Sequence, residues 1–534
     1  MKRQFIQLVG GLVALGVVGT TVPANAQVTP FQIVGHIENF VLDPTVCPTV
    51  PPEPPVPAEF IGARMTVNGI SVVIPCHTVI LMPAAYFTPS QLFDKAPGAT
   101  PGTNMNNSQL ALEDATKPLA AFEVSIDGNI VGGSYIAGQV HISQQSLNSG
   151  AGFIKSINYD TGELRIGANP TTSVTNADAR IHVNDPETDI LDANGEKTGR
   201  YGLSNKQQFR TAPANARFPD SRFQVDQGNP TIHALTGYPM CVPRFDPAIK
   251  NDPQCPAKNR LMGQSTFVMD TVPFQPPAAF GTQAILPCGT PCDPELQAPF
   301  MVGDYVTYVG TVAEDDGGGR FVSVHTMVGN IGIYTKPGGR AYVTLDESLI
   351  GTKGNIVSCG SIAECQDRIK IEGFSTDPNP NRTVSVYAID VVPGGASTVR
   401  KLSSAAKVQA VLGRFRYVTG KNAGVLFNAS GTLKGATREL MARIDDGAPL
   451  PDGTPVPTSP TAANGLVAGQ YVAPVGEYIF PEPTGVQGGF LPALNFQCLA
   501  FLINGWALPD NGLPDILPLK PWPGATPPTF SCSN

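Results

Sequence analysis

Short runs in which apolar and polar residues alternate recur along most of the chain, and turn residues separate them. Residues 65–74 form two such runs joined by Asn68-Gly69, a pair that favours a two-residue hairpin turn. Residues 153–166 and 305–324 repeat this arrangement around their own turn residues. A period of two places successive side chains on opposite faces of a strand. The pattern therefore predicts a mainly β protein in which hairpins build several small antiparallel barrel or sandwich modules in tandem, with long Pro/Gly-rich loops.

Helical periodicity is scarce, so we expect few and short helices. Only residues 399–411 and 433–444 are predicted to be helical, because Ala, Lys and Arg stand in supporting positions there. Residues 205–300 carry little periodic signal of either kind. We expect them to be long loops held by disulfides.

A weak repeat runs through the strand pattern: an opening strand that ends in Gly, a hairpin, and a short strand bearing Thr or His. The run Thr-Val-Asn-Gly at 66–69 and the run Gly-Asp-Tyr-Val at 303–306 belong to it. These motifs resemble those of small five-stranded OB-like barrels that are repeated in exported bacterial proteins of unassigned role. The resemblance covers part of the chain and implies a fold, not an activity.

The chain, at 534 residues, is too long for one hydrophobic core, so several domains are expected. Composition shifts to Pro-rich connectors at 48–57 and 446–462. The predicted organisation is a signal peptide (1–26), a first β module (27–96), a second β module (97–204), a loop-rich disulfide-stapled region (205–298), a third β module (299–392) and a C-terminal mixed region with a Pro-rich tail (393–534).

The N-terminus has the order of parts typical of a secretory signal. Lys2 and Arg3 precede an apolar stretch at 5–18, and the small residues of 24–26 offer a cleavage site. An uncleaved anchor is the alternative interpretation. No later segment has 18 or more consecutive apolar residues, so no membrane span is expected after cleavage. The predicted location is secreted, periplasmic or on the cell surface.

Ten cysteines follow the signal, and an even number in an exported chain indicates a disulfide framework. They fall into five sequence-local couples, for which nearest-neighbour pairing is the simplest hypothesis. The spacing of Cys288 and Cys292 would also suit half a zinc site, an alternative that needs further ligands nearby. The expected pairs are Cys47 with Cys76, Cys241 with Cys255, Cys288 with Cys292, Cys359 with Cys365 and Cys498 with Cys532.

Charge argues against nucleic-acid binding. Lys and Arg number 35 against 43 Asp and Glu, for a net charge of −8, and no basic cluster is present. Neutralising phosphates requires Lys and Arg grouped on one face. Charged residues make up 15% of the chain, well below the ~25% of ordinary globular proteins, and Gly (56) and Pro (52) are abundant. This composition suits turn-rich β structure outside the cytoplasm.

The six histidines and the acidic residues are the side chains from which a catalytic site would be built. No Gly-x-Ser-x-Gly elbow, EF-hand loop or phosphate-binding Gly loop occurs, so neither cofactor nor metal is expected. Four histidines lie in alternating runs that predict strands. His233 instead lies in a loop just before Cys241, near Tyr238, and loop residues on a rigid scaffold carry function more often than strand residues. His233 and Tyr238 are therefore the candidate site, with a structural hydrogen-bonding role as the alternative.

Two functions follow from these observations. The first is a non-enzymatic secreted or cell-surface protein with a structural, adhesive or binding role, whose partners are other extracellular or surface components or further copies of itself. Exposed strand edges could serve such contacts. The alternative is a secreted hydrolase or oxidoreductase whose site is assembled from distant loops around His233. A carboxylate and a hydroxyl within hydrogen-bond reach of His233 would favour the enzyme.

Overall fold

The computed structural model of the chain describes most of its N-terminal two thirds and selected parts of the remainder. The described residues are 28–47, 60–202 (except 145–146, 186, 193 and 196), 220–351 (except 277–282, 290–291 and 316), 363–364, 368–391, 397–402, 406–407, 413–418, 436–444, 464–474, 477–479, 482–483 and 519–524. The expected signal peptide at 1–26 lies outside these residues.

The first unit, barrel 1, is a closed sheet of five strands. It consists of β1 (Thr29–Asp43), β2 (Gly62–Val67), β3 (Ile70–Ile74), β6 (Glu123–Val131) and β7 (Ser134–Ser143). Antiparallel pairs join β3 to β2, β2 to β1, β1 to β6 and β6 to β7, and a parallel pairing of β3 with β7 closes the circle. Numbered along the barrel, the strands follow the order 1-2-3-5-4 and return to 1.

The hairpin between β2 and β3 forms where the sequence predicts it. Asn68 and Gly69 have φ angles of 52° and 72°, a left-handed conformation that Gly and Asn adopt most readily. Alternate residues of β2, among them Met65 and Val67, are fully buried in the core of barrel 1. The local alternation thus sets which face of the hairpin points inward.

A helical turn and two short strands lie between β3 and β6. They are β4 (Ile80–Leu81), β5 (Tyr86–Phe87) and α1 (Pro89–Asp94). Thr88 caps α1 in a capping box with Gln91, which satisfies backbone donors at its start. Buried residues of α1 pack into the core of barrel 1.

Barrel 2 repeats the same strand order with a long insertion. Its strands are β8 (Ser149–Ile157), β9 (Leu164–Gly167), β10 (Ala179–Val183), β18 (Tyr305–Glu314) and β19 (Arg320–Gly329). A parallel pairing of β10 with β19 closes the barrel. Because β10 and β18 are distant in sequence, everything between them is an insertion in one barrel.

In its described residues, that insertion consists mostly of loops with short elements. Some of its strands pair with barrel 2 or with β20, which follows barrel 2 in sequence. The elements of the insertion are β11 (Glu187–Leu191), β12 (Lys197–Gly199), η3 (Ser221–Phe223), β13 (Ile232–Ala234), β14 (Met240–Cys241), η4 (Ala257–Asn259), β15 (Thr266–Met269), β16 (Leu286–Pro287) and β17 (Ala298–Pro299), and β20 spans Gly332–Thr335.

The third unit contains two larger sheets and a two-stranded ribbon. One sheet has the order β27-β23-β21-β30, and the other has the order β25-β24-β28-β29 with β26 beside β24. The strands are β21 (Val343–Gly351), β22 (Ala363–Glu364), β23 (Arg368–Ser375), β24 (Thr383–Val391), β25 (Ser397–Lys401), β26 (Ala406–Lys407), β27 (Arg414–Val418), β28 (Ala436–Ile444), β29 (Gln470–Pro474), β30 (Glu477–Ile479) and β31 (Glu482–Pro483).

Both predicted helices are wrong, because the described parts of these segments are strands. Residues 436–444 form β28, which pairs with β24 on one side and β29 on the other. Leu440, Met441 and Ala442 are all fully buried, so the strand is covered on both faces and lacks the exposed alternate face that would have identified it. Within 399–411, residues of β25 and β26 pair with β24, and this pairing overrides their helix-favouring composition.

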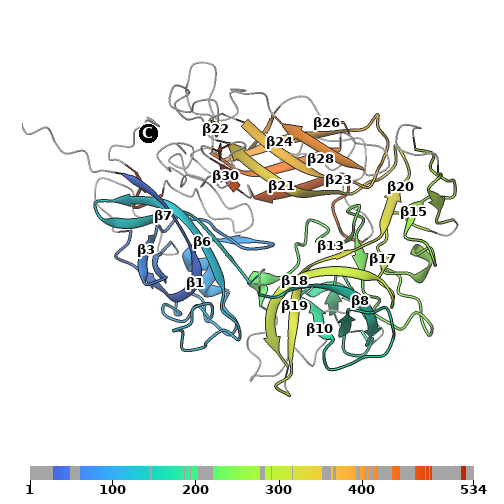
Figure 1. Ribbon diagram of the computed structural model, residues 1–534, viewed down its shortest axis with the longest axis horizontal. Coiled ribbons are helices and arrows are strands. Elements are labelled where there is room, and N and C mark those ends of the chain that lie inside the picture. The colour runs from blue at the N-terminus through green and yellow to red at the C-terminus, as the bar shows by residue number, and fades with distance from the viewer. Residues whose placement is uncertain are drawn as a thin grey trace, which may run out of the picture.

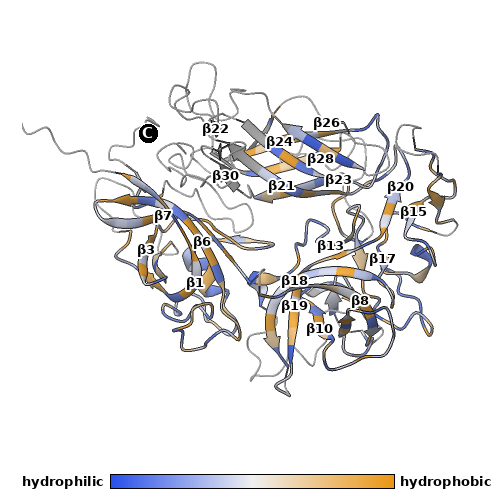
Figure 2. Cartoon of the chain, viewed as in Figure 1, coloured by the Kyte–Doolittle hydropathy of each residue, from blue (hydrophilic) through white to orange (hydrophobic). Residues whose placement is uncertain are grey.

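The prediction of a mainly β protein with small barrels is confirmed, and Figure 1 shows barrel 1 (blue to cyan) and barrel 2 (green and yellow) below the third unit (orange to red). Apolar residues alternate with polar ones along the barrel strands in Figure 2. The barrels do not follow the expected modules one by one. Barrel 1 draws strands from both sides of the expected boundary after residue 96, and barrel 2 from 97–204 and 299–392.

Three of the five expected cysteine pairs are bonded, and no free cysteine remains among the described residues. The bonded pairs are Cys47 with Cys76, Cys241 with Cys255 and Cys288 with Cys292. The other two pairs, Cys359 with Cys365 and Cys498 with Cys532, lie outside the described residues. Within the described segments, no helix has the length and apolar character needed to cross a membrane.

Candidate functional site

His233, the histidine singled out from the sequence, lies on β13 beside β19 and not in a free loop. Its Nδ1 is 2.6 Å from the carbonyl oxygen of Ala234, and its backbone forms a bridge with Pro239. Burial lowers the pKa of His233, which favours the neutral imidazole. Among the described residues, no carboxylate or side-chain hydroxyl is hydrogen-bonded to it.

Tyr238 is fully buried and serves the packing of barrel 2 and its insertion. Its hydroxyl donates a hydrogen bond of 2.6 Å to the carbonyl of Leu296, and its ring meets Tyr342 edge to face at 5.5 Å. Burial raises the pKa of Tyr238 well above its usual value, so the phenol stays protonated. The two predicted site residues are close in the chain, but their observed hydrogen bonds to main-chain carbonyls are structural ones.

A carboxylate, a histidine and a hydroxyl do come together on the wall of barrel 2. Glu163 Oε2 lies 3.9 Å from His182 Nε2, and His182 is the register partner of Ser323 across β10 and β19. Arg180 bridges Glu163 at 2.7 Å and Asp315 at 2.8 Å. The His182 imidazole and the Arg180 guanidinium lower the pKa of Glu163 to about 2, whereas burial lowers the pKa of His182.

This cluster has the residue types of a nucleophilic triad but not its accessibility. His182 is completely buried and Ser323 is 2% exposed, and the ring of Phe321 covers His182 edge-on at 4.8 Å. The Ser323 hydroxyl has no hydrogen-bond partner among the described residues. A hydrolase must bring its substrate's carbonyl to the nucleophile. With both groups enclosed, the cluster is best explained as a buried polar network in the barrel wall.

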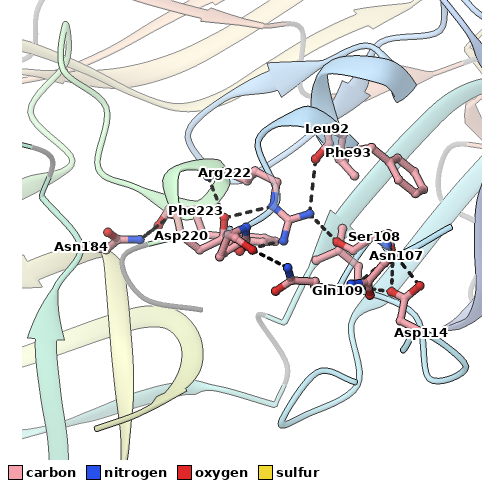
Figure 3. Close-up of polar contacts among 12 residues, drawn as sticks. Leu92, Phe93, Asn107, Ser108, Gln109, Asp114, Asn184, Asp220, Arg222 and Phe223 are labelled. Atoms are coloured by element: carbon pink, nitrogen blue, oxygen red, sulfur yellow. Dashed lines mark hydrogen bonds and ion pairs between the residues drawn. The ribbon is translucent and has the colours of Figure 1, made fainter. Parts of the chain in front are cut away.

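A second set of buried polar contacts joins the units, and sequence reasoning missed it. It is centred on residues 220–229, here called the hub segment, which lies in the insertion of barrel 2. The Arg222 side chain donates to the carbonyl of Ser108 at 2.7 Å and, more weakly, to that of Leu92 at 3.4 Å, in α1 and the loop that connects β3 to β6 of barrel 1. Asp220 pairs with the same guanidinium at 2.8 Å (Figure 3).

The loop that receives Arg222 is itself ordered by a carboxylate. Asp114 accepts hydrogen bonds from the hydroxyl and the amide of Ser108 and from the amides of Leu110 and Ala111. These bonds orient the Ser108 carbonyl toward the guanidinium, as Figure 3 shows. The buried Arg222 thus meets acceptors that are already fixed, which limits the entropic cost of ordering them.

The hub segment is held to barrel 2 by Asn184, which directly follows β10. Asn184 Nδ2 donates to the carbonyls of Asp220 and Phe223, both at 2.9 Å, and the Val225 amide donates to the Asn184 carbonyl at 2.9 Å. Phe223 in turn stacks on Phe122 of barrel 1, with ring centroids 5.0 Å apart. One short segment therefore links the two barrels: Asn184 bonds it to barrel 2, and Arg222 and Phe223 join it to the barrel 1 unit.

The same segment also reaches the third unit. The Asn229 side chain donates to the carbonyl of Val472 on β29 at 2.8 Å and accepts from its amide at 3.1 Å. The Tyr201 hydroxyl donates a hydrogen bond of 2.7 Å to the Asn229 carbonyl, which also holds the end of the hub segment in place. A separate contact between Tyr86 of barrel 1 and Glu439 of β28 adds a second link to the third unit.

The sequence offers little that would reveal this hub. The spacing of Asp220 and Arg222 looks like an ordinary turn, and the hydrogen bonds of Arg222 to carbonyls more than 100 residues away form only in the folded protein. No group of three or more metal-ligating side chains occurs in the described part of the chain. Cys288 and Cys292 are bonded to each other, so they are not available as zinc thiolates.

Compared with protein-family models, with curated proteins and with solved structures, the chain has no match.

Proposed function

We propose that this chain is a non-enzymatic protein with a structural, adhesive or binding role, working outside the cytoplasm. The observation that carries the proposal is the hub segment, in which buried polar groups join the three β units. Arg222, Phe223 and Asn229 each serve a different contact between units. Buried charges are costly unless they are paired, so such a network favours one fixed arrangement of units over independent modules.

The shared strand order of the two barrels supports the interpretation of them as OB-like modules. Both have five strands in the order 1-2-3-5-4 with a parallel closing pair. OB-like barrels present one face and its adjoining loops to ligands of several kinds. A fold of this type is compatible with binding and does not by itself imply catalysis.

Three disulfides support a location in an oxidising compartment, in agreement with the predicted export signal. We infer that the protein is secreted, periplasmic or at the cell surface. Its proposed partners are other surface or extracellular components, or further copies of the chain. The alternative function, a hydrolase or oxidoreductase built around His233, gains no support from the hydrogen bonds of that residue.

The proposal is tested on the native protein. Cell fractions would be probed with an antibody, and the purified protein would be assayed against panels of model esters and glycosides and with redox dyes. We expect recovery in an envelope or extracellular fraction, in a large assembly, without turnover. A freely dissolved monomer whose turnover is abolished by His233→Ala, with melting temperature retained, would establish the enzyme instead.

A further inference from the structure

A short stretch near the end of the chain lies against barrel 1. The Lys520 carbonyl oxygen accepts a hydrogen bond from the Cys76 amide at 3.3 Å and lies 2.8 Å from Cys47 Sγ. Three residues later, the Pro523 carbonyl accepts a bond of 2.5 Å from Asn129 Nδ2. These contacts connect the first β unit with residues almost 400 positions further along the chain.

The surface that receives this stretch is built to bind carbonyl groups. Cys76 and Asn129 are both fully buried, and a buried donor without an acceptor costs free energy comparable to a lost hydrogen bond. The tail supplies the acceptors from a Leu-Lys-Pro-Trp-Pro-Gly sequence at 519–524. Proline keeps its carbonyl and lacks an N–H group, so a Pro-rich segment suits a surface that offers donors.

We propose that this surface of barrel 1, formed by Cys47, Cys76 and Asn129 and here called the tail-acceptor site, takes residues 519–524 from a second copy of the chain and so links copies together. The proposal rests on the proposed structural role and gives it a mechanism of assembly. In the single chain, the site is occupied by the chain's own tail. Exchanging an identical segment between copies preserves every contact and is a low-cost route to association.

The length of the connection allows the exchange. Residues 484–518 separate the end of β31 from the tail, and the 14 residues 484–497, which precede the expected Cys498–Cys532 bond, span up to ~48 Å when extended at ~3.4 Å per residue. Because the tail belongs to the same chain, binding to the chain's own site competes with binding to a second copy. Exchange between copies therefore becomes dominant where copies are crowded, as in a surface layer, and dilute protein stays closed on itself.

The first test measures binding of the tail to an open site. An acceptor copy lacks residues 519–524 but keeps Cys498 and Cys532, and a fluorescent peptide of residues 516–527 is titrated into it. Polarisation should show saturable binding to the acceptor copy, at least tenfold tighter than binding to the wild-type chain, whose own tail competes. A scrambled peptide should not bind. Equal, weak binding of both peptides would overturn the proposal.

A matched pair of variants tests the residues of the site. In the acceptor copy, Asn129→Ala removes the bond to the tail and should weaken peptide binding about tenfold, the effect of one hydrogen bond of average strength. Asn39→Ala removes an exposed bond to Glu113 elsewhere on barrel 1 and should leave peptide binding unchanged. Circular dichroism and melting curves verify that both variants fold. Equal effects of the two substitutions would refute the assigned site.

The decisive experiment joins two copies. A donor copy has the full tail and Asn129→Ala, and is mixed with the acceptor copy at about the dissociation constant measured for the peptide. Light scattering after size exclusion should show a mixed dimer that neither copy forms alone. Two separate monomers would overturn the exchange. If exchange occurs but the wild-type protein also turns over a substrate, the proposed function fails while this inference stands.

Discussion

Replacing Arg222 with Ala should weaken the contact between barrel 1 and the hub segment more than any exposed substitution does. The side chain is 1% exposed and its charge is neutralised by Asp220 at 2.8 Å. It also donates a hydrogen bond of 2.7 Å to the carbonyl of Ser108, in the segment between α1 and β6 of the barrel 1 unit. Truncation removes the guanidinium from both, and leaves the Asp220 carboxylate with the Arg222 backbone amide but without its counter-charge, in a space that water enters poorly.

The loss of the buried ion pair sets how far Arg222→Ala lowers the free energy of unfolding. Removing one partner of a buried ion pair costs about 3–5 kcal/mol, because the other charge stays buried and uncompensated. Asp220 retains 14% exposure, so we expect the lower end, about 3 kcal/mol. This is a large part of the ~5–15 kcal/mol that stabilises a typical folded domain. Adding Asp220→Ala should cost less than the sum of the single changes, since it removes the unpaired charge.

The assay is urea denaturation with a matched control. Arg64→Ala breaks an ion pair with Asp43 on the same barrel, but Arg64 is 47% exposed and the pair should contribute ~1 kcal/mol or less. Hydrogen exchange on peptides covering 88–111 and 220–225 localises the effect. A loss for Arg222→Ala that equals the loss for Arg64→Ala, or unchanged exchange in both peptides, would refute the reasoning.

Three further predictions concern stability. Reduction of Cys47–Cys76, which are 29 residues apart, should cost about 3.5 kcal/mol by chain entropy and lower the melting temperature; equal melting with and without reductant would contradict a stabilising role. Burial lowers the pKa of His325 to about 4 from its usual 6.5, so the unfolded state binds more protons between these values and stability falls as pH drops below 6.5, by about 2 kcal/mol at pH 5. His325→Gln should flatten that pH dependence of the unfolding free energy, and an unchanged slope would exclude this residue as its source. Asn229→Ala, which removes both bonds to Val472, should expose the β29 segment to faster hydrogen exchange without altering exchange in barrel 1.

The hairpins and the short disulfide loops could be predicted from the sequence because the interactions that form them act between neighbouring residues. The hairpin at 65–74 depends on Asn68-Gly69 and on alternation, and the observed φ angles and burial agree with both. Cys47–Cys76 and the two other bonded pairs connect neighbours in the sequence, where the shortest loop is the simplest expectation. Residues 436–444 were wrongly predicted as a helix, because a strand covered on both faces loses its alternation of apolar and polar residues.

The sequence predicted the fold better than it predicted the candidate site. His233 was selected because it lay outside any periodic run, yet it joins β19 as a short parallel strand. Parallel pairing depends on a partner strand far away in the sequence, so no local sequence pattern predicts it. The role of Arg222 could not be predicted from the sequence either. Its neighbours in the sequence are those of a turn, and only its burial against Ser108 reveals its role.

The sequence by itself determined that this is a mainly β protein of hairpins, and it made pairing of neighbouring cysteines the simplest hypothesis, which three pairs in the described part of the chain follow. Only the tertiary structure decided which hairpins share a barrel, through the closing pairs β3–β7 and β10–β19, and that the hub segment joins the units. The physical reason is the range of the interactions. Alternation, turn conformation and short disulfide loops act between neighbours, whereas barrel closure and a buried Arg222 depend on surfaces that exist only after the chain has folded.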